Sequence, residues 1–80
     1  MDINLVYNKI IENLRVSNNQ KVIVELENAS ANASTGSEAL MSSASYLSNL
    51  KKSNPSVYEL IKYLIEDYLK YCKDNGLIIK

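Results

Sequence analysis

Apolar residues recur every three or four positions in four blocks of this chain, and each block follows a helix-start signal. That spacing places the apolar side chains on one face of an α-helix. A chain of 80 residues holds a single hydrophobic core, and short links between helices favour antiparallel neighbours. The sequence therefore predicts one all-α domain over residues 1–80, folded as a compact antiparallel bundle of about four helices.

Two of these blocks lie in the N-terminal half. Asp2 is a candidate N-cap for a first helix, whose apolar stripe is Ile3, Tyr7, Ile10 and Leu14. Ser17 and Gln20 have the spacing of a capping box for a second helix, which continues through Val22, Leu26, Ala29 and Ala33. The stretch 21–27 is β-branched and partly alternating, so a strand remains open there. Helix is favoured because the helical spacing extends to Ala33.

The other two blocks have clearer boundaries. Thr35 and Glu38 form a second capping-box pattern, and the stripe after them is Leu40, Ala44, Leu47 and Leu50. Asn54 is the predicted N-cap of the last helix, with Pro55 at the first helical position, where its missing N–H costs nothing. Gly76 is predicted to end that helix in a left-handed conformation, with Leu77 folding back onto the last turn.

Charge and composition exclude several classes of function. Nine basic and nine acidic residues cancel, which argues against the basic surface that binds nucleic acid. The chain has no histidine and a single cysteine, Cys72, which we expect to be buried and structural. The common zinc sites and histidine-based catalytic arrangements are therefore excluded. We predict no catalytic, metal or cofactor site and no enzyme activity.

The chain also lacks the apolar segments that membranes require. It contains no run of about 18 apolar residues, the minimum for a membrane-spanning helix. Its first residues, Met1–Asn4, do not have the basic and apolar regions of a signal peptide. We therefore expect no membrane association and a cytoplasmic location.

The last helix has more apolar surface than three thin helices can easily cover. Its charged residues form one narrow stripe that we expect to be solvated and salt-bridged, with Glu66 and Lys70 as a favourable pair. Because tyrosine is enriched at interfaces, we predict a surface for a protein partner, or for a second copy in a dimer. The candidate residues are Tyr58, Tyr63, Tyr68, Tyr71, Leu77 and Ile79.

The stretch Ala33-Ser34-Thr35-Gly36-Ser37-Glu38-Ala39-Leu40-Met41, followed by the long helix to Gly76, resembles small helical bacterial proteins of the immunity type. That resemblance implies a module that binds and neutralises a toxin. Two alternatives stay open: a small DNA-associated transcriptional regulator and a structural homo-oligomeric bundle. The segment before Lys51 offers serine, alanine and methionine rather than residues that read bases, so we expect no nucleic-acid partner.

Overall fold

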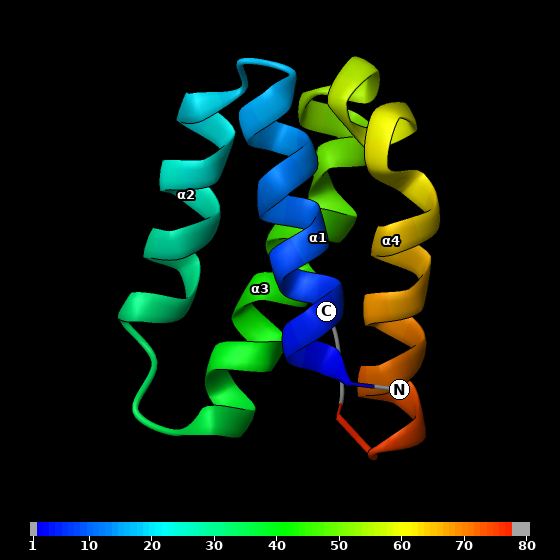
Figure 1. The fold of residues 1–80 in the computed structure, drawn as a ribbon. Helices are drawn as coiled ribbons and strands as arrows, with labels where there is room; N and C mark the ends of the chain where they lie inside the picture. The colour runs from blue at the N-terminus through cyan, green and yellow to red at the C-terminus, as the bar shows by residue number, and fades with distance from the viewer. Residues whose placement is uncertain (1, 78–80) are drawn as a thin grey trace.

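The computed structural model of the protein describes residues 2–77 (Figure 1). Within that range the chain forms four helices and no strand: α1 (Ile3–Val16), α2 (Gln20–Ala31), α3 (Gly36–Ser53) and α4 (Pro55–Asp74). The predicted all-α bundle is confirmed. The stretch 21–27 is helical and belongs to α2, so the alternative of a strand is wrong.

The helices run alternately up and down, and each packs against its neighbour in the chain (Figure 1). α1 also contacts α4, which closes the ring, so that α1 lies opposite α3 and α2 lies opposite α4. In Figure 1, α1 is in front, α2 to its left, α4 to its right and α3 behind. The radius of gyration, 11.5 Å, is that of a compact domain of this length.

Three of the predicted helix starts are confirmed by hydrogen bonds. The Asp2 carboxylate accepts from the Asn4 N–H at 3.0 Å, and the Thr35 hydroxyl accepts from the Glu38 N–H at 3.1 Å. The Asn54 side chain accepts from the Val57 N–H at 3.4 Å, directly before Pro55. Each bond satisfies an N–H group that the first turn of a helix leaves without a backbone partner.

The predicted capping box at Ser17 is wrong. Ser17 instead closes α1, where its hydroxyl donates to the Asn13 carbonyl at 2.8 Å. Asn18 then adopts a left-handed conformation (φ 62°), and the Asn19 N–H donates to the Leu14 carbonyl at 2.8 Å. Asparagine tolerates this conformation better than most residues, so Asn18 takes the place that glycine usually has after a helix. α2 begins without a side-chain cap.

α4 ends as the sequence predicts but contains a bend that it does not. Gly76 is left-handed (φ 74°), and the Leu77 N–H donates to the Cys72 carbonyl at 2.9 Å. Leu77 then packs, partly buried, against the core. The bend is at Ile61, whose φ and ψ leave the helical region although its side chain is fully buried.

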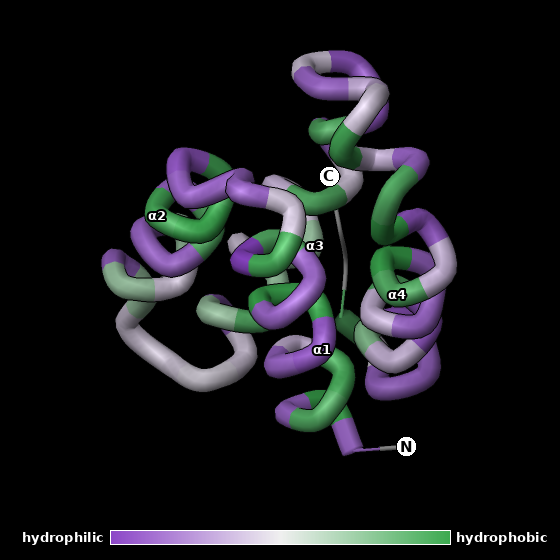
Figure 2. The backbone as a smooth tube through the Cα atoms, turned by 45° about the horizontal axis from the view of Figure 1, so that its top comes forward, coloured by the Kyte–Doolittle hydropathy of each residue, from purple (hydrophilic) through white to green (hydrophobic). Residues whose placement is uncertain are grey.

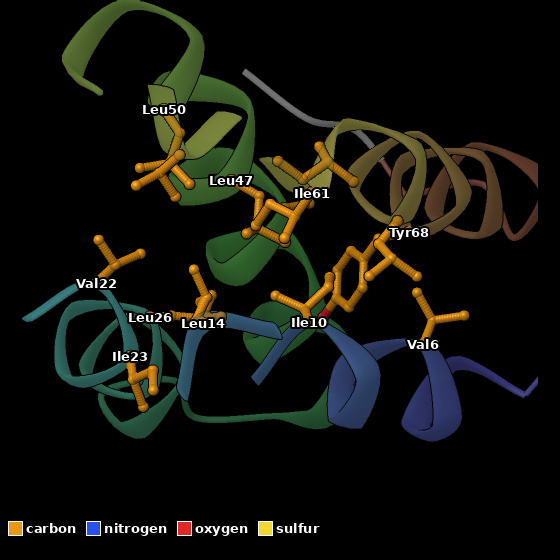
Figure 3. Packing of buried hydrophobic residues seen from close by; sticks show 14 of the residues in the cluster. Val6, Ile10, Leu14, Val22, Ile23, Leu26, Leu47, Leu50, Ile61 and Tyr68 are labelled. Atoms are coloured by element: carbon orange, nitrogen blue, oxygen red, sulfur yellow. The ribbon is translucent and has the colours of Figure 1, made fainter. Parts of the chain in front are cut away.

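The core runs along the centre of the ring and takes side chains from all four helices. Each helix alternates between hydrophobic and hydrophilic segments, as a half-buried helix does (Figure 2). Figure 3 shows Leu14 meeting Leu26 at one end, and the Tyr68 ring reaching from α4 toward Ile10 and Val6 of α1 at the other. None of the helices in residues 2–77 is long and apolar enough to cross a membrane.

Candidate functional site

One side of α1 carries apolar residues outside its core stripe. Tyr7 lies on the side of α1 toward α2, because its hydroxyl meets that of Ser30. At about 100° per residue, Leu5, Lys9 and Val16 lie on the other side, turned toward α4 and outward. All three are exposed, and Val16 exposes 76% of its surface.

A matching stripe runs along α4. This stripe lies between the buried stripe and the charged stripe of the helix. Its residues are three or four positions apart: Leu60, Tyr63, Asp67 and Tyr71. α4 runs downward in Figure 1 with its buried side toward the centre. The right-handed turn of the helix then places this stripe on the side facing α1. Tyr58 and Leu69 fall on the opposite side, toward α3, and pack against the core.

The two stripes lie at matching heights. The rings of Tyr7 and Tyr68 are 6.4 Å apart, and the helices are antiparallel, so residues whose numbers add up to about 75 lie side by side. By this register Leu5 is level with Tyr71 and Lys9 with Asp67. Leu60 comes before the bend at Ile61 and lies toward the same end of the bundle as Val16. These residues lie on the same outward side of the α1–α4 pair, which we call the α1–α4 face: Leu5, Lys9, Val16, Leu60, Tyr63, Asp67 and Tyr71.

The α1–α4 face gathers most of the exposed apolar side chains that the structure describes. The five large hydrophobic residues with high exposure in residues 2–77 are Leu5, Val16, Val24, Leu60 and Tyr63. Four of them belong to this face, whereas Val24 lies on α2. Apolar residues that cluster in this way on a small surface mark a site of interaction more often than scattered ones do.

Charged side chains on α4 form no ion pair within residues 2–77. The one ion pair among residues 2–77 joins Arg15 to Glu12 in α1, at 3.0 Å. Glu66 and Lys70 form no such pair, so the predicted salt-bridged stripe on α4 is wrong. Lys9 and Asp67 on the α1–α4 face also have no charged partner among the described residues. Their charges are open to groups from another molecule.

The predicted partner residues on α4 have different environments. Tyr63 is the most exposed of the four tyrosines, at 62%. Tyr71 is partly exposed on the same stripe, whereas Tyr58 is partly buried on the side toward α3. The structure therefore brings Tyr63 and Tyr71 together on the α1–α4 face and separates Tyr58 from them.

Tyr68, a predicted partner residue, is instead part of the core. Only 2% of its surface is exposed, because it continues the stripe of Ile61, Leu64 and Ile65. Ser43 of α3 forms a hydrogen bond with Tyr68 and is small and buried, which leaves room for an aromatic ring. A tyrosine on the buried stripe of a helix packs like any other large apolar residue.

The two predicted tail residues do not add to this face. Leu77 is partly buried and packs against the core rather than standing free. Ile79 lies outside the described residues.

Sequence reasoning missed the contribution of α1. Leu5 and Val16 lie outside the stripe of Ile3, Tyr7, Ile10 and Leu14, on the otherwise polar side of the helix. Apolar residues on the polar side of a helix indicate a second contact surface. On α4, the apolar spacing includes Leu60 in the buried stripe, but 45% of its surface is exposed.

A hollow at the end of the bundle is a second candidate. It measures about 370 Å³, within the range of small-ligand sites. Small side chains at the end of α2 and the start of α3 leave this space, and its lining is Ile3, Asn4, Tyr7, Ser30, Gly36, Ala39, Leu40, Ser43 and Tyr68. Part of the stretch that resembles immunity proteins, Gly36–Leu40, lies at its wall.

The polar groups of this hollow are neutral. Burial is the main cause that raises the pKa of Tyr7, and the nearby Glu27 carboxylate adds to it. Burial also raises the pKa of Tyr68 to about 12, although a hydrogen bond with Ser43 opposes the shift. No carboxylate or amine side chain lines the hollow. The lining therefore offers hydroxyl and amide groups for hydrogen bonds, but no acid–base pair for catalysis.

Chemistry elsewhere in the described chain is equally limited. Cys72 is free and buried, and burial raises the pKa of its thiol, so the predicted structural role is confirmed. Residues 2–77 contain no group of three or more cysteine or carboxylate side chains that could hold a metal ion.

Comparison of the chain with protein-family models, curated proteins and solved structures found no match. What the molecule does is therefore inferred from its own surface.

Proposed function

We propose that this protein is a non-enzymatic protein-binding module and that the α1–α4 face is its binding surface. The observation that carries the proposal is the gathering of Leu5, Val16, Leu60 and Tyr63 on two neighbouring helices. An aromatic side chain amid aliphatic ones, with charges at the same surface, is the composition of a protein interface.

The end hollow supports this function less well. Its lining is apolar and neutral, but it lies partly between core side chains, and Tyr7 and Tyr68 contribute to the core as well as to its wall. The exposed apolar residues of the α1–α4 face, in contrast, are not part of the core. Exposing large apolar side chains costs solubility, and binding another chain removes that cost.

The most specific form of the proposal is an immunity-type protein that neutralises a toxin. It is supported by the resemblance of Ala33–Met41 to such proteins. Co-expression with the toxin of a neighbouring gene tests this form. Survival of the host cells supports it, and killing despite normal expression of this chain refutes it while leaving the wider proposal in place.

Site-specific photo-crosslinking tests the wider proposal directly. A photo-reactive amino acid replaces Tyr63 on the α1–α4 face in cells that express the protein natively. We expect it to form a covalent adduct with a protein chain, because Tyr63 is the most exposed aromatic residue of the face.

Asn49 is the matched control position, because it is exposed on α3, away from this face. An adduct from position 63 and none from position 49 supports the proposal. Equal adducts from both positions, or none from position 63, would refute it.

A further inference from the structure

We propose that the α1–α4 face pairs with the same face of a second copy of this chain, so that α1 of each copy lies against α4 of the other. This inference rests on the proposed function and names its partner. It is carried by the opposite charges and the apolar residues that the two halves of the face present.

Opposite charges stand at the same height on the two halves of the face. Lys9 on α1 and Asp67 on α4 are level with each other, and both are exposed. Neither forms an ion pair within residues 2–77. A twofold axis parallel to the helices keeps these heights and exchanges the two halves. It therefore places Lys9 of each copy opposite Asp67 of the other.

The apolar residues fall into register under the same axis. Val16 and Leu60 lie toward one end of the face, and Leu5 is level with Tyr71 near the other. In the pair, Val16 of one copy meets Leu60 of the other, and Leu5 meets Tyr71. Two apolar contacts then flank each ion pair, which is the arrangement in which surrounding contacts exclude water from a central interaction.

The net charge of the whole chain does not oppose this pairing. Nine basic and nine acidic residues cancel, so two copies do not repel each other at neutral pH. A face made of two helices in an 80-residue chain is small, at the low end of specific interfaces. We therefore expect a reversible dimer rather than a permanent one.

Charge reversal and mixing test the arrangement. In Lys9→Glu alone, both ion pairs of the dimer become repulsive, and the same is true of Asp67→Lys alone. When the two variants are mixed, the carboxylate introduced at position 9 of one chain faces the amine introduced at position 67 of the other. The second pair in that mixed dimer is the original Lys9 and Asp67. Sedimentation velocity at several concentrations measures the dissociation constant of each sample.

We expect each single variant to dimerise at least about tenfold more weakly than the unmodified chain, and the mixture to recover dimers that contain one chain of each kind. The matched controls, Lys52→Glu on α3 and Glu27→Lys on α2, carry the same changes of charge outside the face and should dimerise normally. Circular dichroism shows whether each variant is folded.

An unmodified chain that stays monomeric at millimolar concentration would overturn the inference. Single variants that dimerise normally, or a mixture that forms no mixed dimers, would overturn the arrangement proposed here. If the crosslink from position 63 then joins this chain to a different protein, the proposed function stands although the self-pairing fails.

Discussion

The Tyr68 ring fills space in the core beside the small side chain of Ser43 of α3. Replacing it with alanine would empty that space, and the surrounding helices could close it only in part. We expect Tyr68→Ala to lower the free energy of unfolding by about 3–5 kcal/mol, measured by urea unfolding. Tyr63→Ala is the control and should change it by less than about 0.5 kcal/mol. Similar losses in both variants would contradict these assignments.

Tyr68 also makes stability depend on alkaline pH. Burial raises its pKa in the folded chain from 10.0 to about 12, so the folded state keeps the hydroxyl proton more tightly than the unfolded state does. The stabilisation is complete below pH 10 and is lost as pH rises toward 12, because the unfolded chain releases the proton first. Tyr7 and Tyr46 shift in the same direction.

We therefore expect the urea midpoint to fall between pH 10 and pH 12, and to fall less in Tyr68→Phe than in the unmodified chain. Spectroscopic unfolding curves at pH 8, 10 and 11 measure both effects. Equal losses in the two proteins would show that Tyr68 does not cause this dependence.

At the level of single residues, the sequence predicts which side chains are apolar but not how much room each will find. Tyr63 and Tyr68 are five residues apart on one helix and have the same chemistry. Tyr68 continues the buried stripe of Ile61, Leu64 and Ile65, whereas Tyr63 lies on the exposed side of the same helix. The caps at Asp2, Thr35 and Asn54 were predictable because each depends on a hydrogen bond between residues two or three positions apart.

Gly76, which ends α4, needs a left-handed backbone, whereas Gly36, which begins α3, does not. Gly76 adopts φ 74°, which an added Cβ would strain, although no neighbouring atom lies within 4 Å of it. Gly36 has the same open space around it and begins α3 with an ordinary backbone conformation. We expect Gly76→Ala to lower the free energy of unfolding by about 1–2 kcal/mol.

Gly36→Ala is the comparison, and it should be neutral or raise the free energy of unfolding by up to about 1 kcal/mol, because alanine favours the helix. Thermal unfolding followed by circular dichroism compares the two variants. A Gly76→Ala variant as stable as the unmodified chain would contradict the left-handed end of α4.

At the level of elements, all four helices were predictable, but two local features were not. After α1, the left-handed residue is Asn18, whereas a glycine there would have predicted the end of the helix. The bend of α4 at Ile61 occurs without a proline or glycine, the residues from which a bend is usually predicted. Neither feature can be predicted from the periodicity of apolar residues along a single helix. The face of α1 that carries Leu5 and Val16 was readable, since both residues break the polar side of an amphipathic helix.

The net charge of the whole chain is zero, which does not favour binding to DNA. Lys51 and Lys52 end α3, where they complement the negative end of the helix dipole, and the net charge of the chain is zero. We expect a DNA duplex to bind weakly or not at all at physiological salt, measured by fluorescence anisotropy with a competitor of random sequence. Sequence-specific binding in the nanomolar range would instead favour a regulator.

The pairing of helices explains why the candidate surface was only partly foreseen. The sequence placed the surface on the last helix with its tail, but it could not show that α1 lies beside α4 and supplies half of the face. That neighbour relation follows from the closed ring, which puts residues from the two ends of the chain at the same height. Tyr63 and Tyr71 belong to the predicted set, whereas Leu5, Lys9 and Val16 enter through the fold.

The central claim is that two copies of this chain meet through the α1–α4 face. Its most direct test is a series of ¹H–¹⁵N correlation spectra of the unmodified protein, recorded from low micromolar to millimolar concentration. Self-pairing predicts concentration-dependent shifts at the amides of Leu5, Lys9, Val16, Leu60, Tyr63 and Asp67, and unchanged positions around Val24 on α2. Spectra that do not change with concentration, or shifts centred on α2 and α3, would contradict the account.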